Sequence, residues 1–484
     1  MSPSPTSTAT SALGSYLSSS GGSFHPALYS KQDEFGTSIY TSQRLSPGEN
    51  VVCCPFALAV TPTLARTSIP TSLFPAGDDV ASPRRKARQP HHEVMALYLC
   101  LHLLPASLAA RLAADEGLAL QHRVYVENLP ASEAMRTTLY FSPAERELLR
   151  GSNLYGATEE RERGWRDEWE DVRNWVADED VRREVGWERW LWACTLISRR
   201  WGADGAGRVG ASSRAFPSSL IDGDKPNSTP VLFPGIDMLN HRPTSKITWS
   251  ADVHVETAGT GAEGKKGKGS LTIVLDEAVG ADEQIFNTYG AKSNEELLLG
   301  YGFVLAANPA DFVALKLSLP PACSPALFDL IHDLGLENLR HFVPRSGALP
   351  GELLAQMRLL VASAEEVEEL VQARQESERG AWEQVVGFVS WENELDVLDA
   401  LEGMLQSKLQ GLESADASSH AAQGVRPDVA EMVRIYRRGQ IEIIKAAIAY
   451  RERLFEETIQ KAEEDGVQLA FEDDEMEEID EEEE

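Results

Sequence analysis

Two short motifs in the middle of this 484-residue chain constrain its fold more than any other feature of the sequence. The first, DMLNH at residues 237–241, ends an apolar stretch with an Asn-His pair. The second, NTYGAKSNEELLLGYGF at residues 287–303, places tyrosine-glycine pairs on both sides of a short helical pattern. Tyrosine-glycine is typical of a turn, and Ser293 or Asn294 is suited to cap the helix that follows. Taken alone, these motifs predict a strand, a turn and a helix, with Tyr301 packed in the core.

Strand patterns and helical patterns occupy separate blocks of the chain. Residues 34–60 mix β-branched residues with glycine and proline turns, which predicts two or three short strands. Strand patterns return over 230–275, whereas residues from 92 to about 200 and those beyond 303 show apolar residues at helical spacing. The blocks predict an α+β fold, in which a β-rich part of short strands carries a helical insert and is followed by an all-α C-terminal domain.

The domain boundaries follow from these blocks and from local composition. A start rich in Ser, Thr, Gly and Pro predicts a disordered tail over 1–22, and an acid-rich end predicts another over 466–484. Between the tails we expect a β-rich domain over 23–303, with its insert at about 92–200. A helical domain is expected over 304–465, ending in one long helix.

The chain is strongly acidic, with a formal net charge of −31 that remains −20 when the eleven acids of residues 472–484 are set aside. This charge disfavours direct binding of nucleic acid and favours a basic protein partner. The basic cluster RRKAR at 84–88 is more typical of a solvated loop than of a nuclear import signal. No apolar run is long enough to span a membrane, and the N-terminal segment has no signal-peptide pattern. We expect a cytoplasmic or nuclear protein that does not associate with membranes.

The cysteines are few and scattered, at Cys53, Cys54, Cys100, Cys194 and Cys323. No pair has the CxxC spacing of a structural zinc site, and five residues do not make a disulfide framework. We expect reduced, structural cysteines and no bound metal.

The two motifs together resemble the signature of SET-domain protein methyltransferases of the Rubisco large-subunit methyltransferase-like class. Further elements match this class: SRAF at 213–216, the strand pair around Asp33 and Gly36 with RLSPGE at 44–49, and GALPGELLAQMRLL at 347–360. Two segments of the insert, HRVYVENLP at 122–130 and YFSPAERELLRGSNL at 140–154, are similar as well. The likeness extends over residues 24 to 460 and implies a SET fold with a helical C-terminal substrate-binding domain.

The resemblance also implies a chemistry and a set of site residues. The methyl donor is S-adenosyl-L-methionine and the acceptor is an amine that must be neutral to attack, inside a narrow aromatic channel that disfavours its charged form. Tyr289 is implied as the catalytic residue. The residues implied to bind the donor are Asp33, Glu34, Phe35, Arg214, Asn240, His241, Tyr289 and Phe303. Those implied to bind the protein substrate are Asp237, Tyr301 and Phe216, with Asp237 serving either to attract a cation or to cap a turn.

The sequence departs from the family pattern at two places. Glu34 stands where the family has a glycine before the aromatic residue. The glycine-rich segment 199–212 separates the helix at 192–198 from SRAF, and its removal would restore the family spacing. With the segment present, Ser198-Arg199 is a rival match for Ser213-Arg214. Both departures concern the predicted donor site.

Three functions are compatible with these features. The first is a protein-lysine N-methyltransferase that acts on a nonhistone protein such as a ribosomal protein or a translation factor. The second is a protein-histidine methyltransferase, and here Ile236 favours lysine because that position is often aromatic in histidine-directed members. The third is an inactive SET scaffold that binds a basic partner, against which the intact Tyr289, Asn240 and His241 argue.

Overall fold

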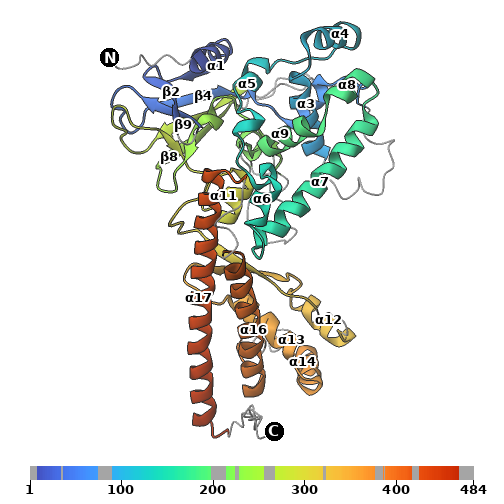
Figure 1. The fold of residues 1–484 in the computed structure, drawn as a ribbon, viewed down its shortest axis with the longest axis vertical. Helices are drawn as coiled ribbons and strands as arrows, with labels where there is room; N and C mark the ends of the chain where they lie inside the picture. The colour runs from blue at the N-terminus through green and yellow to red at the C-terminus, as the bar shows by residue number, and fades with distance from the viewer. Residues whose placement is uncertain are drawn as a thin grey trace, which may run out of the picture. The chain divides into compact units, whose positions relative to one another are not determined.

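The computed structural model describes residues 8–33, 36–74, 90–197, 214–223, 228–254, 268–319, 323–376, 385, 387–416 and 424–467. The chain divides into two compact units (Figure 1). The first unit comprises Met1–Glu147, Leu154–Leu305 and Gly424–Met432. The second unit comprises Leu148–Asn153, Ala306–Gln423 and Val433–Glu484.

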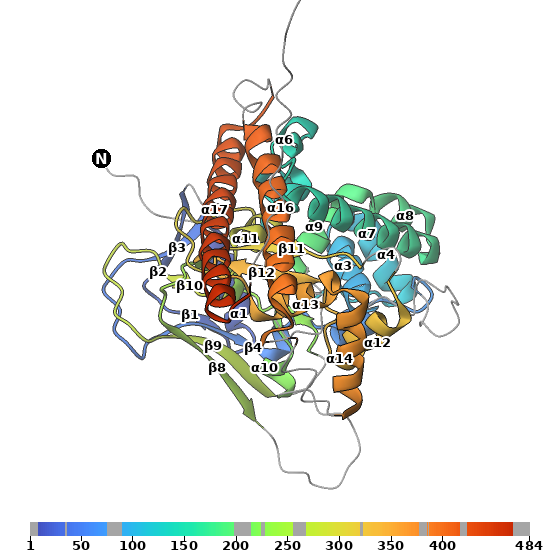
Figure 2. The same cartoon turned by 90° about the horizontal axis from the view of Figure 1, so that it is seen from below.

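A four-stranded antiparallel sheet forms the β-rich part of the first unit. Its strands lie in the order β1-β4-β9-β8, with bounds Ser23–Phe24, Asn50–Pro55, Lys268–Leu275 and Ile247–His254. Figure 2 shows β8 and β9 running side by side along their length. Alternate residues of β9, Leu271, Ile273 and Leu275, are buried because side chains of a strand alternate between its two faces. Beside this sheet, β2 (Leu28–Asp33) pairs with β3 (Gly36–Thr41).

The helical insert predicted at about 92–200 is present as a group of helices in the first unit. Its centre is α3 (Pro90–His102) against α9 (Trp187–Ile197), and every residue of α9 from Trp190 onward is buried. A helix buried on all sides belongs in the middle of a core. The surrounding helices are α2 (Pro62–Ser68), α4 (Ala106–Glu116), α5 (Arg123–Glu127), α6 (Pro143–Glu147), α7 (Asn153–Trp175) and α8 (Glu179–Glu184).

Short strands and one short helix carry the two sequence motifs. The short elements are β5 (Phe216–Pro217), α10 (Ser219–Asp222), β6 (Pro230–Val231), β7 (Asn240–His241), β10 (Phe286–Asn287) and α11 (Asn294–Gly300). β5 pairs with β6 in an antiparallel manner, and β7 pairs with β10 in parallel. These small sheets fix segments that are far apart in the sequence.

The second unit is helical, as predicted, except for one two-stranded sheet. Its elements are β11 (Phe312–Lys316), α12 (Pro325–Asp333), β12 (Arg340–Pro344), α13 (Gly351–Val361), α14 (Ala364–Glu376), α16 (Trp391–Asp416) and most of α17 (Pro427–Glu464). β11 pairs with β12, and buried Val313 lies opposite buried Val343. The expectation of an all-α domain missed this sheet because its two strands are separated by a helix and are only five residues each.

The N-terminal tail is a second correction. Residues 1–22 were expected to be disordered, but Thr8–Ser18 form helix α1. Leu13 and Leu17, one helical turn apart, are both fully buried. Burying a leucine contributes about 1.5–3 kcal/mol, which offsets the weak helix propensity of the Ser and Thr residues around them.

Two further expectations concern the cysteines and membranes. All five cysteines are free thiols, as predicted. Among the helices that the structure describes, none is both long enough and apolar enough to cross a membrane.

Candidate active site

The parallel pairing of β7 with β10 brings the two sequence motifs together. Asn240 lies opposite Phe286, and His241 lies opposite Asn287. Immediately after β10, the backbone N–H of Tyr289 donates a hydrogen bond to Nδ1 of His241 at 3.0 Å. The next residue, Gly290, has φ +84°, a conformation that glycine adopts without strain. The turn predicted at this position therefore directs Tyr289 back toward the Asn-His pair.

A stack of aromatic rings follows from this pairing. The ring of Tyr289 lies between those of His241 and Tyr301, with centroid distances of 4.9 Å and 4.8 Å. Phe303 meets Tyr301 edge to face at 6.1 Å. The four rings form one contiguous aromatic cluster, and the channel for the acceptor amine that the resemblance implies stays a prediction.

The position of Tyr301 depends on the short helix α11 and on a glycine. Ser293 caps α11 and forms a capping box with Glu296, which confirms the helix start that the sequence predicted. The helix is followed by Gly302, which has φ +81° and lies so close to Arg136 that an added Cβ would stand 2.6 Å from its carbonyl carbon. Only glycine fits there, so the chain turns sharply between the two aromatic residues.

The hydroxyl group of Tyr289 is fixed by the backbone. It donates a hydrogen bond to the carbonyl oxygen of Leu239 at 2.9 Å. Burial raises the pKa of Tyr289 to about 12; nearby Arg214 opposes this rise and Asp237 adds to it. The phenol is therefore protonated at physiological pH, and its proton is directed at Leu239.

His241 is neutral and acts as a hydrogen-bond acceptor. Burial lowers its pKa to about 4; the backbone of Asn287 opposes this effect, and the charge of Lys292 reinforces it. Because Nδ1 accepts from the backbone of Tyr289, the proton of the neutral ring is on Nε2. Lys292 precedes α11, and its side chain is only 11% exposed.

A buried carboxylate lies behind the stack. Asp237 has a side chain with no exposed surface. Nη1 of Arg214 donates to its backbone oxygen at 2.8 Å and to Oδ2 at 3.3 Å, and the hydroxyl of Tyr125 donates to Oδ2 at 2.8 Å. Oδ1 is buried without a hydrogen-bond partner among the described residues. Burial raises the pKa of this carboxyl, although Arg214 and Tyr125 counteract the shift.

Two of the remaining predicted donor-site residues have polar contacts in the first unit. The side-chain amide of Asn240 donates to Oγ of Ser38 at 2.8 Å, which ties β7 to β3. Oδ2 of Asp33 accepts a hydrogen bond from the hydroxyl of Tyr40 at 2.9 Å. Glu34, Phe35, Ser213 and the segment 199–212 lie outside the described residues.

Phe216 lies in the hydrophobic core. Its ring packs edge to face against Trp249 at 4.9 Å and against Phe233 at 5.7 Å, and the residue is 7% exposed. The structure thus unites Tyr289, Tyr301, Phe303 and His241 in one stack, with Arg214 and Asp237 joined to each other beside Tyr289. A contact of Phe216 with substrate stays a prediction from the resemblance.

Sequence reasoning missed Tyr125 and Ser38. Tyr125 lies on α5, 112 positions before the aspartate that it contacts, and Ser38 lies 202 positions before Asn240. No spacing rule connects residues so far apart. The one available signal was the segment 122–130, which resembled the family insert and contains Tyr125.

Comparisons with known proteins agree with this architecture. The family model described as Rubisco LSMT substrate-binding matches residues 328–444. A ribosomal lysine N-methyltransferase, set10 of Schizosaccharomyces pombe, is 28% identical over 437 residues, which cover 88% of this chain and 68% of that protein. An actin-histidine N-methyltransferase of Drosophila melanogaster is 28% identical over 51% of this chain and 45% of its own length.

The fold is also found among solved structures. A crystal structure of the SET domain of LSMT bound to lysine and AdoHcy superposes with a TM-score of 0.68 at 19% identity, covering 93% of this chain and 92% of that one. The resemblance inferred from the two motifs is confirmed in fold and in the C-terminal match. The chain therefore has the fold of the SET-domain proteins of the Rubisco large-subunit methyltransferase-like class, and its residues 328–444 match the substrate-binding domain of that class.

Proposed function

We propose that this protein is a protein-lysine N-methyltransferase that uses S-adenosyl-L-methionine and acts on a nonhistone protein, of the ribosomal-protein or translation-factor type. The observation that most supports this proposal is the position of Tyr289. Its ring is stacked between His241 and Tyr301, and its hydroxyl donates a hydrogen bond to the carbonyl oxygen of Leu239. The relatives named as lysine methyltransferases support the same reading.

The residues beside Tyr289 fit the methyl donor. Among the described residues, the hydrogen bonds of Arg214 use only Nη1, so Nη2 and Nε remain for the carboxylate of the donor's amino-acid part. Asn240 and His241, which the β7–β10 pairing holds next to Tyr289, are the proposed contacts for the rest of the donor. When bound, the donor supplies a methyl group on a positively charged sulfur.

The protein's own groups have three tasks in this reaction. The hydroxyl oxygen of Tyr289, whose proton is committed to Leu239, keeps its lone pairs for the incoming amine and orients it. The rings of Tyr289, Tyr301 and Phe303 exclude water from the amine's path. An apolar path lowers the pKa of a lysine amine below its usual value of about 10.4, so that it loses its proton before transfer.

The protein substrate and the location are part of the proposal. A basic protein is favoured because the chain carries a net charge of −31. A ribosomal protein satisfies this requirement and is met in the cytoplasm or the nucleus. The basic character of the substrate is tested by measuring transfer at increasing salt concentration. If charge steers the two proteins together, the rate of transfer falls as salt screens their attraction.

The function is tested by offering radiolabelled S-adenosyl-L-methionine and the purified protein to ribosomal proteins from a host extract. Hydrolysis of the labelled band and analysis of its amino acids identifies the target. Methyl-lysine supports the proposal. Methyl-histidine supports the alternative that the actin-histidine relative represents, and the absence of label together with the absence of donor binding supports an inactive scaffold.

A further inference from the structure

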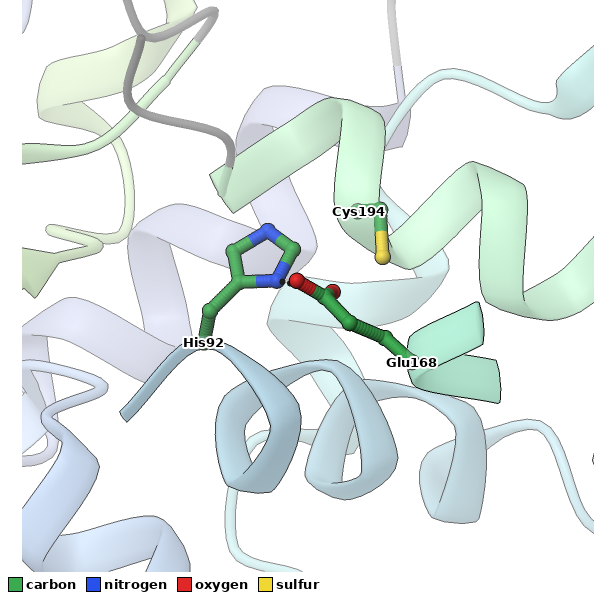
Figure 3. Close-up of side chains that lie close together, drawn as sticks. All are labelled: His92, Glu168 and Cys194. Atoms are coloured by element: carbon green, nitrogen blue, oxygen red, sulfur yellow. Dashed lines mark hydrogen bonds and ion pairs between the residues drawn. The ribbon is translucent and has the colours of Figure 1, made fainter. Parts of the chain in front are cut away.

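Three side chains with metal-binding atoms converge inside the helical insert, and none of them is among the residues proposed for methyl transfer. His92 belongs to α3, Glu168 to α7 and Cys194 to α9, and Figure 3 shows them directed at one another. Nδ1 of His92 lies 3.0 Å from Oε2 of Glu168. One donor atom from each of the three residues lies within 4.8 Å of the others.

The distances suit a small cation after a minor adjustment. Bonds of about 2.0–2.3 Å from a tetrahedral zinc ion to nitrogen, oxygen and sulfur place its ligand atoms about 3.3–3.8 Å apart. The nitrogen and oxygen are already closer than this, and the sulfur of Cys194, within 4.8 Å of both, has to approach them by up to about 1 Å. The side chains of His92 and Glu168 are 16% and 20% exposed, so a cation can enter from solvent and keep a water molecule as its fourth ligand.

Acidic side chains lie near the buried thiol of Cys194. Glu168 and Glu93 both act on it electrostatically, and Glu93 is only 1% exposed. A divalent cation held by Cys194 would therefore lie among groups of opposite charge.

We propose that His92, Glu168 and Cys194 bind one divalent cation of the zinc type and thereby link α3, α7 and α9 to one another. On binding, the Cys194 thiol gives its proton to solvent and a sulfur–metal bond forms. The imidazole gives up its hydrogen bond to Glu168 and binds through Nδ1. One thiolate and one carboxylate balance the two positive charges of the ion, which suits a site that is largely buried.

The site is structural and separate from the proposed transfer of methyl groups. It is independent of the two sequence motifs, and its residues come from three helices of the insert. Spacing could not reveal it, because zinc motifs are recognised from ligands close together in the sequence. This explains why the sequence predicted no metal.

The test uses the full-length protein, treated with a chelator and then titrated with Co²⁺, whose thiolate complexes absorb in the near ultraviolet. We expect one equivalent of Co²⁺ per chain to produce a thiolate-to-cobalt absorption band. Added Zn²⁺ should remove this band. Weak binding of Co²⁺ to the acidic residues 472–484 gives no such band, because they contain no sulfur ligand.

Variants assign the band to the site. Cys194→Ser is expected to abolish it, whereas Cys100→Ser keeps it; Cys100 is an equally buried thiol whose Sγ donates to the backbone of Arg189 instead. Glu168→Gln preserves a hydrogen-bond acceptor for His92 and is expected to weaken Co²⁺ binding at least about tenfold. Circular dichroism and donor binding show that each variant is folded.

Two results overturn the proposal. One is the absence of a thiolate band in the wild type, and the other is a band or an affinity that neither Cys194→Ser nor Glu168→Gln changes. In both cases His92 and Glu168 form only an ion pair. Binding of S-adenosyl-L-methionine is measured in the same samples, so a failed metal site and a failed methyltransferase give different outcomes.

Discussion

The hydroxyl group of Tyr125 donates a hydrogen bond of 2.8 Å to Oδ2 of Asp237. This bond joins helix α5 of the insert to the segment that precedes the Asn-His pair. Asp237 in turn holds Arg214 through Nη1. The insert thus positions a proposed donor-binding guanidinium through one buried tyrosine, although Tyr125 itself touches neither donor nor acceptor in this account.

Tyr125→Phe is expected to slow methyl transfer about tenfold, because a hydrogen bond to a charged group contributes about 1.5 kcal/mol. The loss should be larger in donor affinity than in the maximal rate, since Arg214 is the group displaced. Calorimetric titration with the donor and steady-state kinetics measure both quantities.

Tyr140→Phe is the matched control for this substitution. Tyr140 also belongs to the insert, but its hydroxyl lies 3.4 Å from Oγ1 of Thr195 rather than next to Asp237. This variant should leave donor affinity unchanged. Equal effects of the two substitutions would mean that Tyr125 contributes only to folding.

Glu145 and Arg426 form an ion pair of the first unit that is held by three hydrogen bonds. Arg426 donates to Glu145 through its backbone N–H, Nε and Nη2, at 2.8–2.9 Å. Burial of Glu145 favours its neutral form, but these bonds outweigh the effect and lower its pKa to about 2. The carboxylate is 1% exposed, whereas the guanidinium is 34% exposed.

Glu145→Gln is expected to reduce the free energy of unfolding by about 2–3 kcal/mol, below the 3–5 kcal/mol typical of fully buried pairs because Arg426 regains some water. Urea denaturation followed by circular dichroism measures this change. Asp428→Asn removes an exposed partner of Arg136 nearby and should cost under about 1 kcal/mol. Equal costs for the two variants would contradict the account.

Two buried histidines make stability depend on pH. Burial lowers the pKa of His102 to about 4 and that of His122 to about 3. His102 is hydrogen-bonded through Nδ1 to the carbonyl oxygen of Tyr98. His122 is hydrogen-bonded to the hydroxyl of Tyr98 and to the carbonyl oxygen of Leu58. Between pH 6.5 and these lowered values the unfolded chain binds protons that the folded chain does not. The stability contribution is therefore complete above pH 6.5 and is lost as the pH falls.

The free energy of unfolding should fall by roughly 4 kcal/mol between pH 6.5 and pH 4.5. Denaturant titrations at several pH values measure the slope. His332 serves as a control because its side chain is 70% exposed, and His332→Gln should keep the slope. A flat profile for the wild type over this range would show that the two histidines are not held neutral.

The sequence predicted the fold well wherever a pattern was local. The capping box of Ser293, the helices of the insert and the long helix α17 all follow from residues close together. Helix α1 was missed because composition concealed two buried leucines, and the β11–β12 pair was missed because its partners are separated by α12.

The site was predictable only in part. Tyr289, Tyr301, Phe303 and His241 belong to the two motifs, and the structure stacks their rings. Tyr125 and the His92, Glu168 and Cys194 group could not be inferred, because their contacts connect elements that only the folded chain brings together.

The central claim, that Tyr289 serves methyl transfer, is tested most directly by Tyr289→Phe. This change keeps the ring between His241 and Tyr301 and removes only the hydroxyl that donates to Leu239. Transfer of labelled methyl to ribosomal proteins should fall at least about a hundredfold, while donor affinity stays within a few fold of wild type. Unchanged transfer by the variant would contradict the account.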